Sequence, residues 1–224
     1  MTRVAAYPLD EGSGTTAVDI ANGHNLTVSN ATWTTGKNGS ALQSTASNVI
    51  GASSTIPAIT TNVTLMCWVK PLSLASGGTN FACGIIQSNG NTDCAIFAQR
   101  GSFGTGNVLQ ADVRINGGLV ACNGTGALTV NTYDHVAVSY DGSAIKLYKN
   151  AVLMTTTSIS GTISFTTSFY VAGAIAAATL DVNNAVDEPQ IFDQALDQAT
   201  IASYMNTALV AGNPRGGQFL PFFL

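Results

Sequence analysis

Two adjacent pairs of carboxylates are the side chains whose types and spacing are most suggestive of chemistry. The chain has two glutamates, and each directly follows an aspartate, at Asp10-Glu11 and Asp187-Glu188. A glycosidase needs two carboxylates about 5–5.5 Å apart to retain configuration at the sugar, or about 6.5–9.5 Å apart to invert it. Neighbouring residues on a strand point to opposite faces, so Asp187 and Glu188 cannot form such a pair unless a bulge intervenes. We therefore expect that the protein is not an enzyme.

The histidines and cysteines form no pattern typical of a nucleophile or a zinc site. No Ser–His–Asp order or nucleophile elbow is visible, and no Cys-x-x-Cys pair occurs. We expect His135 to be a core or turn histidine bonded to backbone, and His24 to be an exposed turn residue. We expect four reduced, structural cysteines: Cys67, Cys83, Cys94 and Cys122.

The composition limits which partners this chain can have. Of its 224 residues, 46% are hydrophobic and only 9% are charged, so Thr, Ser, Asn, Gly and Ala must cover much of the surface. Such a surface suits burial in an assembly or a polar, uncharged ligand such as a sugar. A net charge of −4 with eight Lys and Arg offers no electrostatic footprint for nucleic acid or an acidic membrane. The apolar run after Arg3 is too short for a signal peptide, so we expect no secretion signal.

The elements that would position these residues are many short strands. Apolar residues alternate with polar ones in several short runs separated by Gly, Asn, Asp and Ser, which is typical of a sandwich or barrel. The clearest runs are Val63–Lys70, Val108–Ile115, His135–Tyr140, Ile145–Tyr148 and Phe169–Ala172. Asp141-Gly142 predicts a type I′ hairpin turn, and Asn116-Gly117-Gly118 predicts a similar one.

One helix is predicted near the end of the chain. Asp197 is a candidate N-cap, and Gly212-Asn213-Pro214 ends the helical pattern. The apolar residues at helical spacing are Ile201, Tyr204, Met205, Ala208 and Leu209. The sequence thus predicts one domain over residues 1–211, followed by an apolar arm over residues 212–224.

Several segments, in order along nearly the whole chain, resemble the laminin-G-like family of concanavalin A-like lectins. They are the opening turn Tyr7–Thr15, the segment Trp33–Leu42, the core strand Val63–Pro71, the hairpin His135–Asn150 and the closing strand Val186–Phe192. Ala151 stands where the family usually has Gly. The resemblance implies an all-β fold, a two-sheet antiparallel jelly-roll sandwich with one short C-terminal helix. The family includes sugar binders, modules of enzymes and structural domains, so it implies no single function.

The resemblance also suggests a cation site. Some relatives bind calcium through Asp side chains and loop carbonyls, and calcium takes six to eight oxygen ligands. The donors expected here are Asp10, Asp19 and Asp187. The alternative is that Asp187 is a structural acid, hydrogen-bonded to loop backbone near the N-terminal turn.

A sugar site would use aromatic faces or polar side chains on a sheet or loop rim. Tyr133, Phe103 and Tyr170 are the aromatic candidates, whereas Trp33 and Trp68 are expected in the core.

The arm suggests an assembly. Fully burying a large apolar side chain is worth roughly 1.5–3 kcal/mol, so we expect the arm to dock onto a partner rather than remain in water. Its partner-binding residues would be Phe219, Leu220, Phe222, Phe223 and Leu224. An alternative is that the arm packs on its own sandwich.

A bacteriophage particle would reconcile a lectin-like fold with the absence of a signal, because phages leave the host by lysis. The leading hypothesis is a non-enzymatic virion surface protein, either a capsid decoration or a minor tail protein. It would contact other virion proteins, form a homo-oligomer, and bind host glycans weakly and multivalently. The alternatives are a cellular carbohydrate-binding module, a glycan-active enzyme, or a cement protein without a ligand.

Overall fold

The computed structural model describes most of the jelly-roll domain. The described residues are 2–44, 51–73, 80–81, 87–88, 94–97, 99–100, 108–163, 165, 168–173 and 183–210. The arm over residues 212–224, together with Cys83 and Phe103, lies outside this described part.

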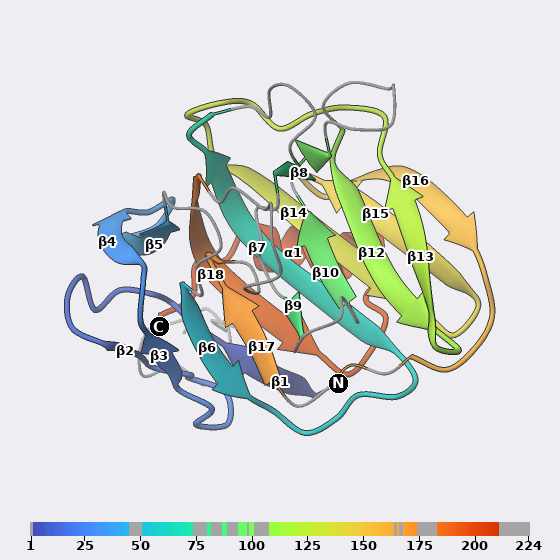
Figure 1. Cartoon of the computed structure of the whole chain (residues 1–224), viewed down its shortest axis with the longest axis horizontal. Coiled ribbons are helices and arrows are strands. Elements are labelled where there is room, and N and C mark those ends of the chain that lie inside the picture. The colour runs from blue at the N-terminus through green and yellow to red at the C-terminus, as the bar shows by residue number, and fades with distance from the viewer. Residues whose placement is uncertain are drawn as a thin grey trace, which may run out of the picture.

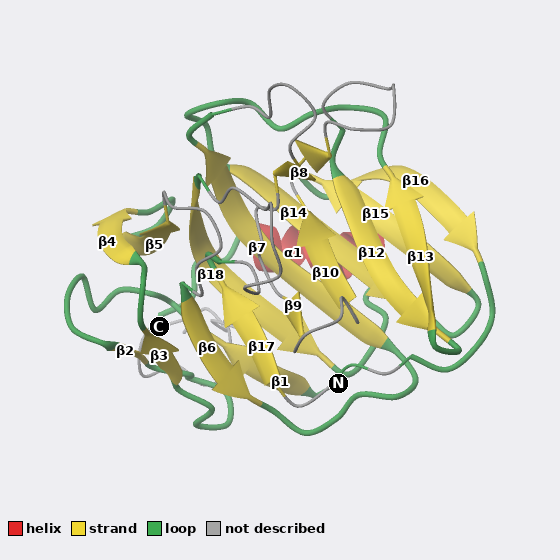
Figure 2. Cartoon of the chain, viewed as in Figure 1, coloured by secondary structure: helices red, strands yellow, loops and turns green. Residues whose placement is uncertain are grey.

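The larger sheet is antiparallel and contains eight strands (Figures 1 and 2). Seven follow one another in the order β16 (Val152–Ser158), β15 (Ala144–Lys149), β14 (Asp134–Tyr140), β7 (Val63–Pro71), β18 (Asn184–Phe192), β5 (Ser40–Ser44) and β4 (Thr32–Thr35). The eighth strand, β1 (Arg3–Ala6), pairs with β18. Strand β18 therefore lies at the centre, and all nine of its residues are buried.

The opposing layer consists of three smaller sheets. A five-stranded sheet has the order β2 (Thr16–Ala17), β3 (Leu26–Val28), β6 (Ala52–Thr55), β17 (Ser168–Val171) and β9 (Gln87–Ser88). A three-stranded sheet has the order β10 (Cys94–Phe97), β12 (Gln110–Ile115) and β13 (Gly118–Asn123). Strands β11 (Gln99–Arg100) and β8 (Asn80–Phe81) form a pair. In Figure 1 this layer lies in front of the eight-stranded sheet.

The alternation of side chains along β7 shows how the layers are held together. Leu65, Cys67 and Val69 belong to the main apolar core. Met66 points the other way and packs with Phe192 into a second cluster, which the helix α1 (Gln198–Met205) covers. The eight-stranded sheet is thus covered on both faces, by strands on one and by the helix on the other. No helix among the described residues is long and apolar enough to span a membrane.

The structure confirms the all-β sandwich with one short C-terminal helix. Asp197 caps α1 as predicted, because its side chain accepts a hydrogen bond from Thr200 N at 2.8 Å. The helix is shorter than the sequence pattern suggested, since it ends at Met205. The Asn206 side chain donates to Ala202 O, and Leu209 N donates to a carboxylate of β18, so both residues are committed to other contacts.

The two predicted hairpins differ in turn type. Asn116 and Gly117 both have positive φ, as a type I′ turn requires. At the other hairpin only Gly142 has positive φ, so the type I′ prediction for Asp141-Gly142 is wrong. The Asp141 carboxylate accepts hydrogen bonds from Ser143 N and Ala144 N, which selects a different backbone path.

The β4–β5 turn packs against the central strand at Gly36. A Cβ atom placed on Gly36 would lie 2.6 Å from Asp187 Oδ2 and closer still to the backbone oxygen of Ser40. The Gly36 N–H also donates to Gly39 O at 3.0 Å. Only a residue without a side chain lets the turn approach β18 this closely.

We expect Gly36→Ala to destabilise the fold by about 1–3 kcal/mol, because a methyl group is forced against backbone. Gly118→Ala is the matched control, since its Cβ would meet nothing nearer than Ile115 O at 3.6 Å. Urea unfolding of both variants provides the comparison. Equal stability of the two variants would contradict this account of the turn.

Candidate functional site

A β-bulge in the central strand determines where the two adjacent carboxylates point. Asp187 pairs with Trp68 and Gln190 pairs with Met66, so Glu188 and Pro189 together oppose the single residue Cys67. Glu188 takes a φ of 49°, in the left-handed region. The extra residue interrupts the alternation of side chains between the two faces.

The bulge places both carboxylates under the β4–β5 turn. Asp187 Oδ2 accepts a hydrogen bond from Asn38 N at 2.9 Å, and the Asn38 side chain hydrogen-bonds to Glu188. Glu188 Oε1 also accepts from Leu209 N at 2.6 Å. The sequence expectation that these residues point to opposite faces held only for a strand without a bulge, and the bulge here breaks the two-residue period.

These carboxylates are buried and hold protons readily. Asp187 is 0% exposed and Glu188 is 2% exposed. Burial, followed by the effect of the Glu188 charge, raises the pKa of Asp187 to about 8. Burial also raises the pKa of Glu188 to about 6. Asp187 Oδ1 is buried without a hydrogen-bond partner in the described part of the chain, which fits a protonated carboxyl. A substrate could reach neither group unless the β4–β5 turn moved.

Aromatic and basic side chains surround this pair on the outer face of the eight-stranded sheet. Lys37 Nζ lies 4.7 Å from the ring centroid of Trp68, which is buried. Tyr133, a sugar-site candidate from the sequence, is covered by Lys70 at 4.8 Å. The Tyr133 hydroxyl donates to Thr35 O at 2.9 Å. These rings brace the β4–β5 turn and so have little capacity left for a ligand.

His135 lies in the core, as expected, whereas His24 is less exposed than expected. His135 packs edge-on against Trp68, with ring centroids 5.2 Å apart. Its Nδ1 has no hydrogen-bond partner among the described residues. Burial lowers the pKa of His135 to about 4, which leaves the ring neutral. His24 is half-buried rather than exposed and lines a hollow.

The three aspartates proposed as calcium donors accept hydrogen bonds from backbone amides. Asp19 alone accepts hydrogen bonds from four N–H groups, those of Ala6, Ala21, Asn22 and His24. Asp10 Oδ1 accepts from Ser40 N, and Asp187 accepts from Asn38 N. No group of three or more His, Cys, Asp or Glu side chains in the described ranges is arranged to hold a metal ion. The bond between Asp187 and loop backbone is of the kind expected for a structural acid, although the amide comes from the β4–β5 turn, and the calcium site stays a prediction.

A polar hollow lies on the outer face of the five-stranded sheet. Thr27 of β3 pairs with Ser53 of β6, and Ser53 pairs with Tyr170 of β17. Leu26, Phe169 and the other residues that alternate with them are buried in the core. The hollow has a volume of 350 Å³ and no charged lining residue; its lining is Asn25, Thr27, Ser53, Ser54, Thr55, Ser168 and Tyr170.

The hydroxyl groups of this hollow are available to a ligand. Within the described residues, those of Thr27, Ser53, Thr55 and Tyr170 make no hydrogen bond, whereas Ser54 donates to His24 O. The structure thus places Tyr170, a candidate from the sequence, among unused polar groups. The sequence did not identify Thr27, Ser53 and Thr55, because three separate strands bring them together.

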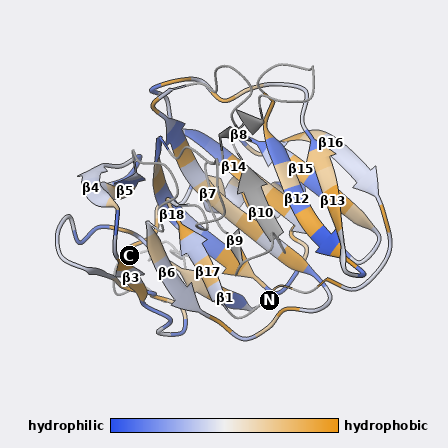
Figure 3. Cartoon of the chain, in the orientation of Figure 1, coloured by the Kyte–Doolittle hydropathy of each residue, from blue (hydrophilic) through white to orange (hydrophobic). Residues whose placement is uncertain are grey.

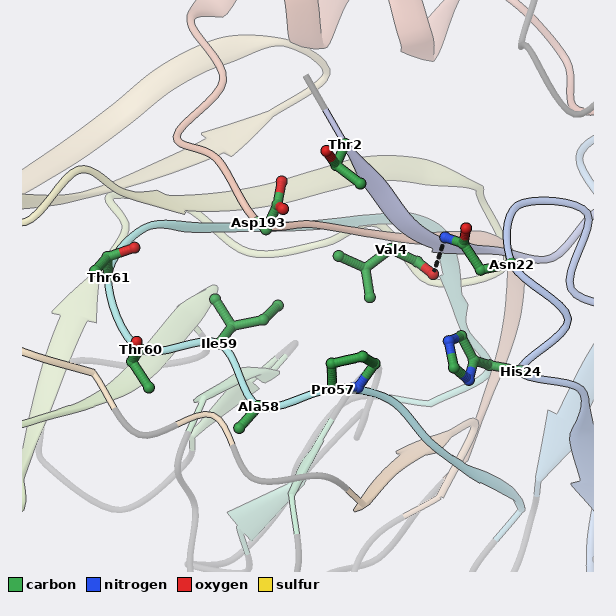
Figure 4. A pocket seen from close by; sticks show the side chains of 10 residues that line it. All are labelled: Thr2, Val4, Asn22, His24, Pro57, Ala58, Ile59, Thr60, Thr61 and Asp193. Carbon is green, nitrogen blue, oxygen red and sulfur yellow. Dashed lines mark hydrogen bonds between the residues drawn. The ribbon is translucent and has the colours of Figure 1, made fainter.

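A second hollow of 460 Å³ lies beside β1 (Figure 4). Val4 and Ile59 are its buried apolar residues, and His24 and Thr61 lie at opposite sides of it in Figure 4. The Asn22 side chain donates at 2.8 Å to both Arg3 O and Val4 O, so its donors are already used. This hollow offers fewer convergent polar groups than the first.

Some of the predicted residues lie outside the described part of the chain. They are Phe103, Cys83, the side chain of Cys94, and the arm residues Phe219, Leu220, Phe222, Phe223 and Leu224. Cys67 and Cys122 are buried thiols that form no disulfide, as predicted for them.

The raised pKa of Asp187 predicts that stability falls as the pH rises. The folded state holds a proton on Asp187 up to about pH 8, so its contribution is fully present at low pH and is lost as the pH passes through 8. The lowered pKa of His135 makes stability rise with pH, but only below about pH 6.5. The range pH 6.5–9 therefore reports on Asp187 without this opposing effect. We expect the melting temperature to fall across this window and Asp187→Asn to flatten the fall. Glu188→Gln removes the neighbouring charge that helps to raise the pKa of Asp187, so it should make the fall smaller without abolishing it. A melting temperature that rises toward pH 9 would contradict the assignment.

Comparisons with known structures identify the same architecture elsewhere. The binding domain of Paraclostridial Mosquitocidal Protein 1 superposes with a TM-score of 0.70 at 13% identity, over 92% of this chain. This chain spans only about half, 53%, of that domain. Domain 4 of AbnA, an extracellular arabinanase from Geobacillus stearothermophilus, was solved in complex with arabinotriose. It superposes with a TM-score of 0.64 at 18% identity, over 90% of this chain and 97% of that one.

The sialidase of Trypanosoma rangeli, solved in complex with sialic acid, gives a TM-score of 0.63 at 15% identity, over 89% of this chain but 32% of that one. At these identities the likeness shows the fold alone. A comparison with curated protein sequences gives no match. A family model, however, matches residues 38–202, which is well over half of the chain. The chain therefore belongs to the concanavalin A-like lectin/glucanases superfamily.

Proposed function

We propose that this protein is a non-catalytic carbohydrate-binding module that binds a neutral oligosaccharide on the outer face of the five-stranded sheet. The observation that carries the proposal is the row of unbonded hydroxyl groups beside the Tyr170 ring, in a hollow without charged residues. A sugar presents hydroxyl groups that match Thr27, Ser53 and Thr55, and apolar C–H surface that packs on an aromatic ring. The absence of charge in the lining favours neutral sugars over acidic ones.

The rigidity of the platform supports binding without rearrangement. Residues next to the hydroxyl row, including Ala52, Phe169 and Val171, are buried in the core, so the sheet fixes the spacing of the polar groups. A site held by strands loses little conformational freedom when a ligand binds. The arabinotriose complex of AbnA domain 4, a chain of nearly the same extent, supports a sugar as the ligand class.

The buried carboxylates favour binding over hydrolysis. A glycosidase needs its carboxyl groups in contact with the sugar. Here Asp187 and Glu188 are at most 2% exposed and are hydrogen-bonded to backbone amides. We infer that they stabilise the bulge and the turn rather than act on a substrate.

Replacing the aromatic ring tests the proposed site. Tyr170→Ala should weaken binding by at least about tenfold, equivalent to about 1.4 kcal/mol, because the stacking surface is lost. Titration calorimetry with a panel of neutral oligosaccharides, beginning with arabinotriose, measures the effect, and a sialylated sugar serves as the charged comparison. Thr60→Ala, in the second hollow, is the matched control and should bind as the unaltered protein does. Unchanged affinity in Tyr170→Ala, or a preference for the sialylated sugar, would refute the site.

Our second proposal is that the protein is a virion surface protein. In that role, glycan binding would attach the particle to its host. What supports it is the charge-poor composition together with the apolar residues Phe219–Leu224. In this setting the arm anchors the domain to a larger particle, and many copies convert weak sugar contacts into firm attachment.

Deletion of residues 215–224 tests this setting. We expect the truncated protein to keep its circular dichroism spectrum and sugar affinity but to lose incorporation into its particle. Electron microscopy of the purified native assembly provides the readout. If the truncated chain assembles normally, the arm is not the anchor, and a lone soluble module is then the better description.

A further inference from the structure

One side of the sandwich exposes two edge strands without charge. Strand β16 is the last strand of the eight-stranded sheet, and β13 is the last strand of the three-stranded sheet. They lie next to each other at the right of Figure 1, and the Cys122 thiol of β13 hydrogen-bonds to Thr157 of β16. Both sheets therefore end on the same side of the molecule.

Both strands carry exposed apolar side chains, and Figure 3 shows hydrophobic colouring on each of them. Five large hydrophobic side chains are exposed among the described residues, and three of them are on these two strands. They are Leu119 of β13, 47% exposed, and Val152 and Leu153 of β16, 62% and 42% exposed. Because Cys122 contacts Thr157, Leu119 lies toward the Ser158 end of β16, whereas Val152 and Leu153 lie at its other end.

The edge strands lack most of the features that prevent edge strands of different molecules from pairing. Folded proteins usually protect a long edge strand with a charged residue, a proline or a bulge. Strand β16 has no charge or proline over its seven residues, and neither has β13. The next strand inward, β15, carries Lys146 and Lys149. A bulge in β16 lies near Met154, and the stretch Thr155–Ser158 beyond it pairs regularly with β15.

We propose that β16 pairs antiparallel with β16 of a second copy of this chain, across a two-fold axis near Thr156. The eight-stranded sheet then continues through both protomers, and the Val152 end of each β16 strand lies against the end of the partner strand that is nearer to Leu119. In a two-fold interface the two copies of β16 run antiparallel, so the strand faces a second strand of the same sequence. A second copy therefore fits better than a different partner. Since that strand is neutral throughout, no like charges meet and no charge is left to recognise an oppositely charged partner.

The dimer is independent of the sugar site but affects its use. The hollow lies on β3, β6 and β17 of the five-stranded sheet, whereas β16 belongs to the eight-stranded sheet. Both copies therefore keep their hollows open. Two hollows on one rigid particle can then engage one glycan surface together, which raises apparent affinity without a new contact.

Sedimentation across a concentration series tests the proposal. The unaltered chain should sediment at twice its mass of 22.9 kDa. Thr156→Lys should raise the dimer dissociation constant at least tenfold, because it sets two lysines against each other at the axis. The matched control is Ser203→Lys on the exposed face of α1, which should remain a dimer. Circular dichroism checks that both variants are folded.

Mixing two charged variants separates self-pairing from other causes. Thr156→Lys and Thr156→Glu should each be monomeric, and an equal mixture should form dimers again because opposite charges now face each other. A monomeric unaltered chain, or failure of the mixture to associate, would overturn the proposal. Open-ended oligomers that Thr34→Lys abolishes would also overturn it, because β16 would then pair with β4 of the next copy. Sugar titration of Thr156→Lys should give the affinity of the single site, so a failed dimer and a failed sugar site are distinguishable.

Discussion

The bulge at Glu188–Pro189 is the constraint on which the rest of the domain depends. It lies in β18, the buried central strand, which pairs with β1, β5 and β7. By adding one residue opposite Cys67, it places two carboxylates under the β4–β5 turn. Those carboxylates accept hydrogen bonds from Asn38 and Leu209, which are far apart in the sequence. Buried amides need acceptors, so the bulge ties the turn and the segment after the helix to one strand.

The two faces of the domain differ in how far they are covered and in how their polar groups are bonded. The outer face of the eight-stranded sheet is closed, by α1 over Met66 and by the β4–β5 turn over Trp68. Asp187 and His135 are buried there, and burial shifts the pKa of each so that its neutral form is favoured. The opposite face keeps its polar groups uncommitted in the hollow around Tyr170. The buried acids and the proposed sugar site thus lie on different sheets, so contacts at the proposed site can vary without disturbing the buried acids.

Scarcity of charge explains both surfaces that we propose to be functional. With charged residues at 9%, Thr and Ser take positions that Lys and Glu occupy in most domains. In the hollow, such residues provide hydrogen bonds without selecting a charge. On β16 they leave an edge that can pair with its own copy without repulsion. The proposed weak recognition of neutral sugars and the proposed self-association would then both follow from the same composition, and together they would favour a multivalent assembly.

The sequence alone determined the features that local chemistry controls. Alternating apolar residues identified β7 and β14, Asn116-Gly117 identified a hairpin turn, and Asp197 identified the start of the helix. Each depends on residues only a few positions apart. The direction of Glu188, the partners of Asp19 and the neighbours of Tyr170 depended on the tertiary structure. A bulge exists only relative to the strand opposite it, and the hydroxyl row around Tyr170 spans strands more than a hundred residues apart. Periodicity and capping patterns cannot predict such contacts, because the contacts arise only when separate strands pair.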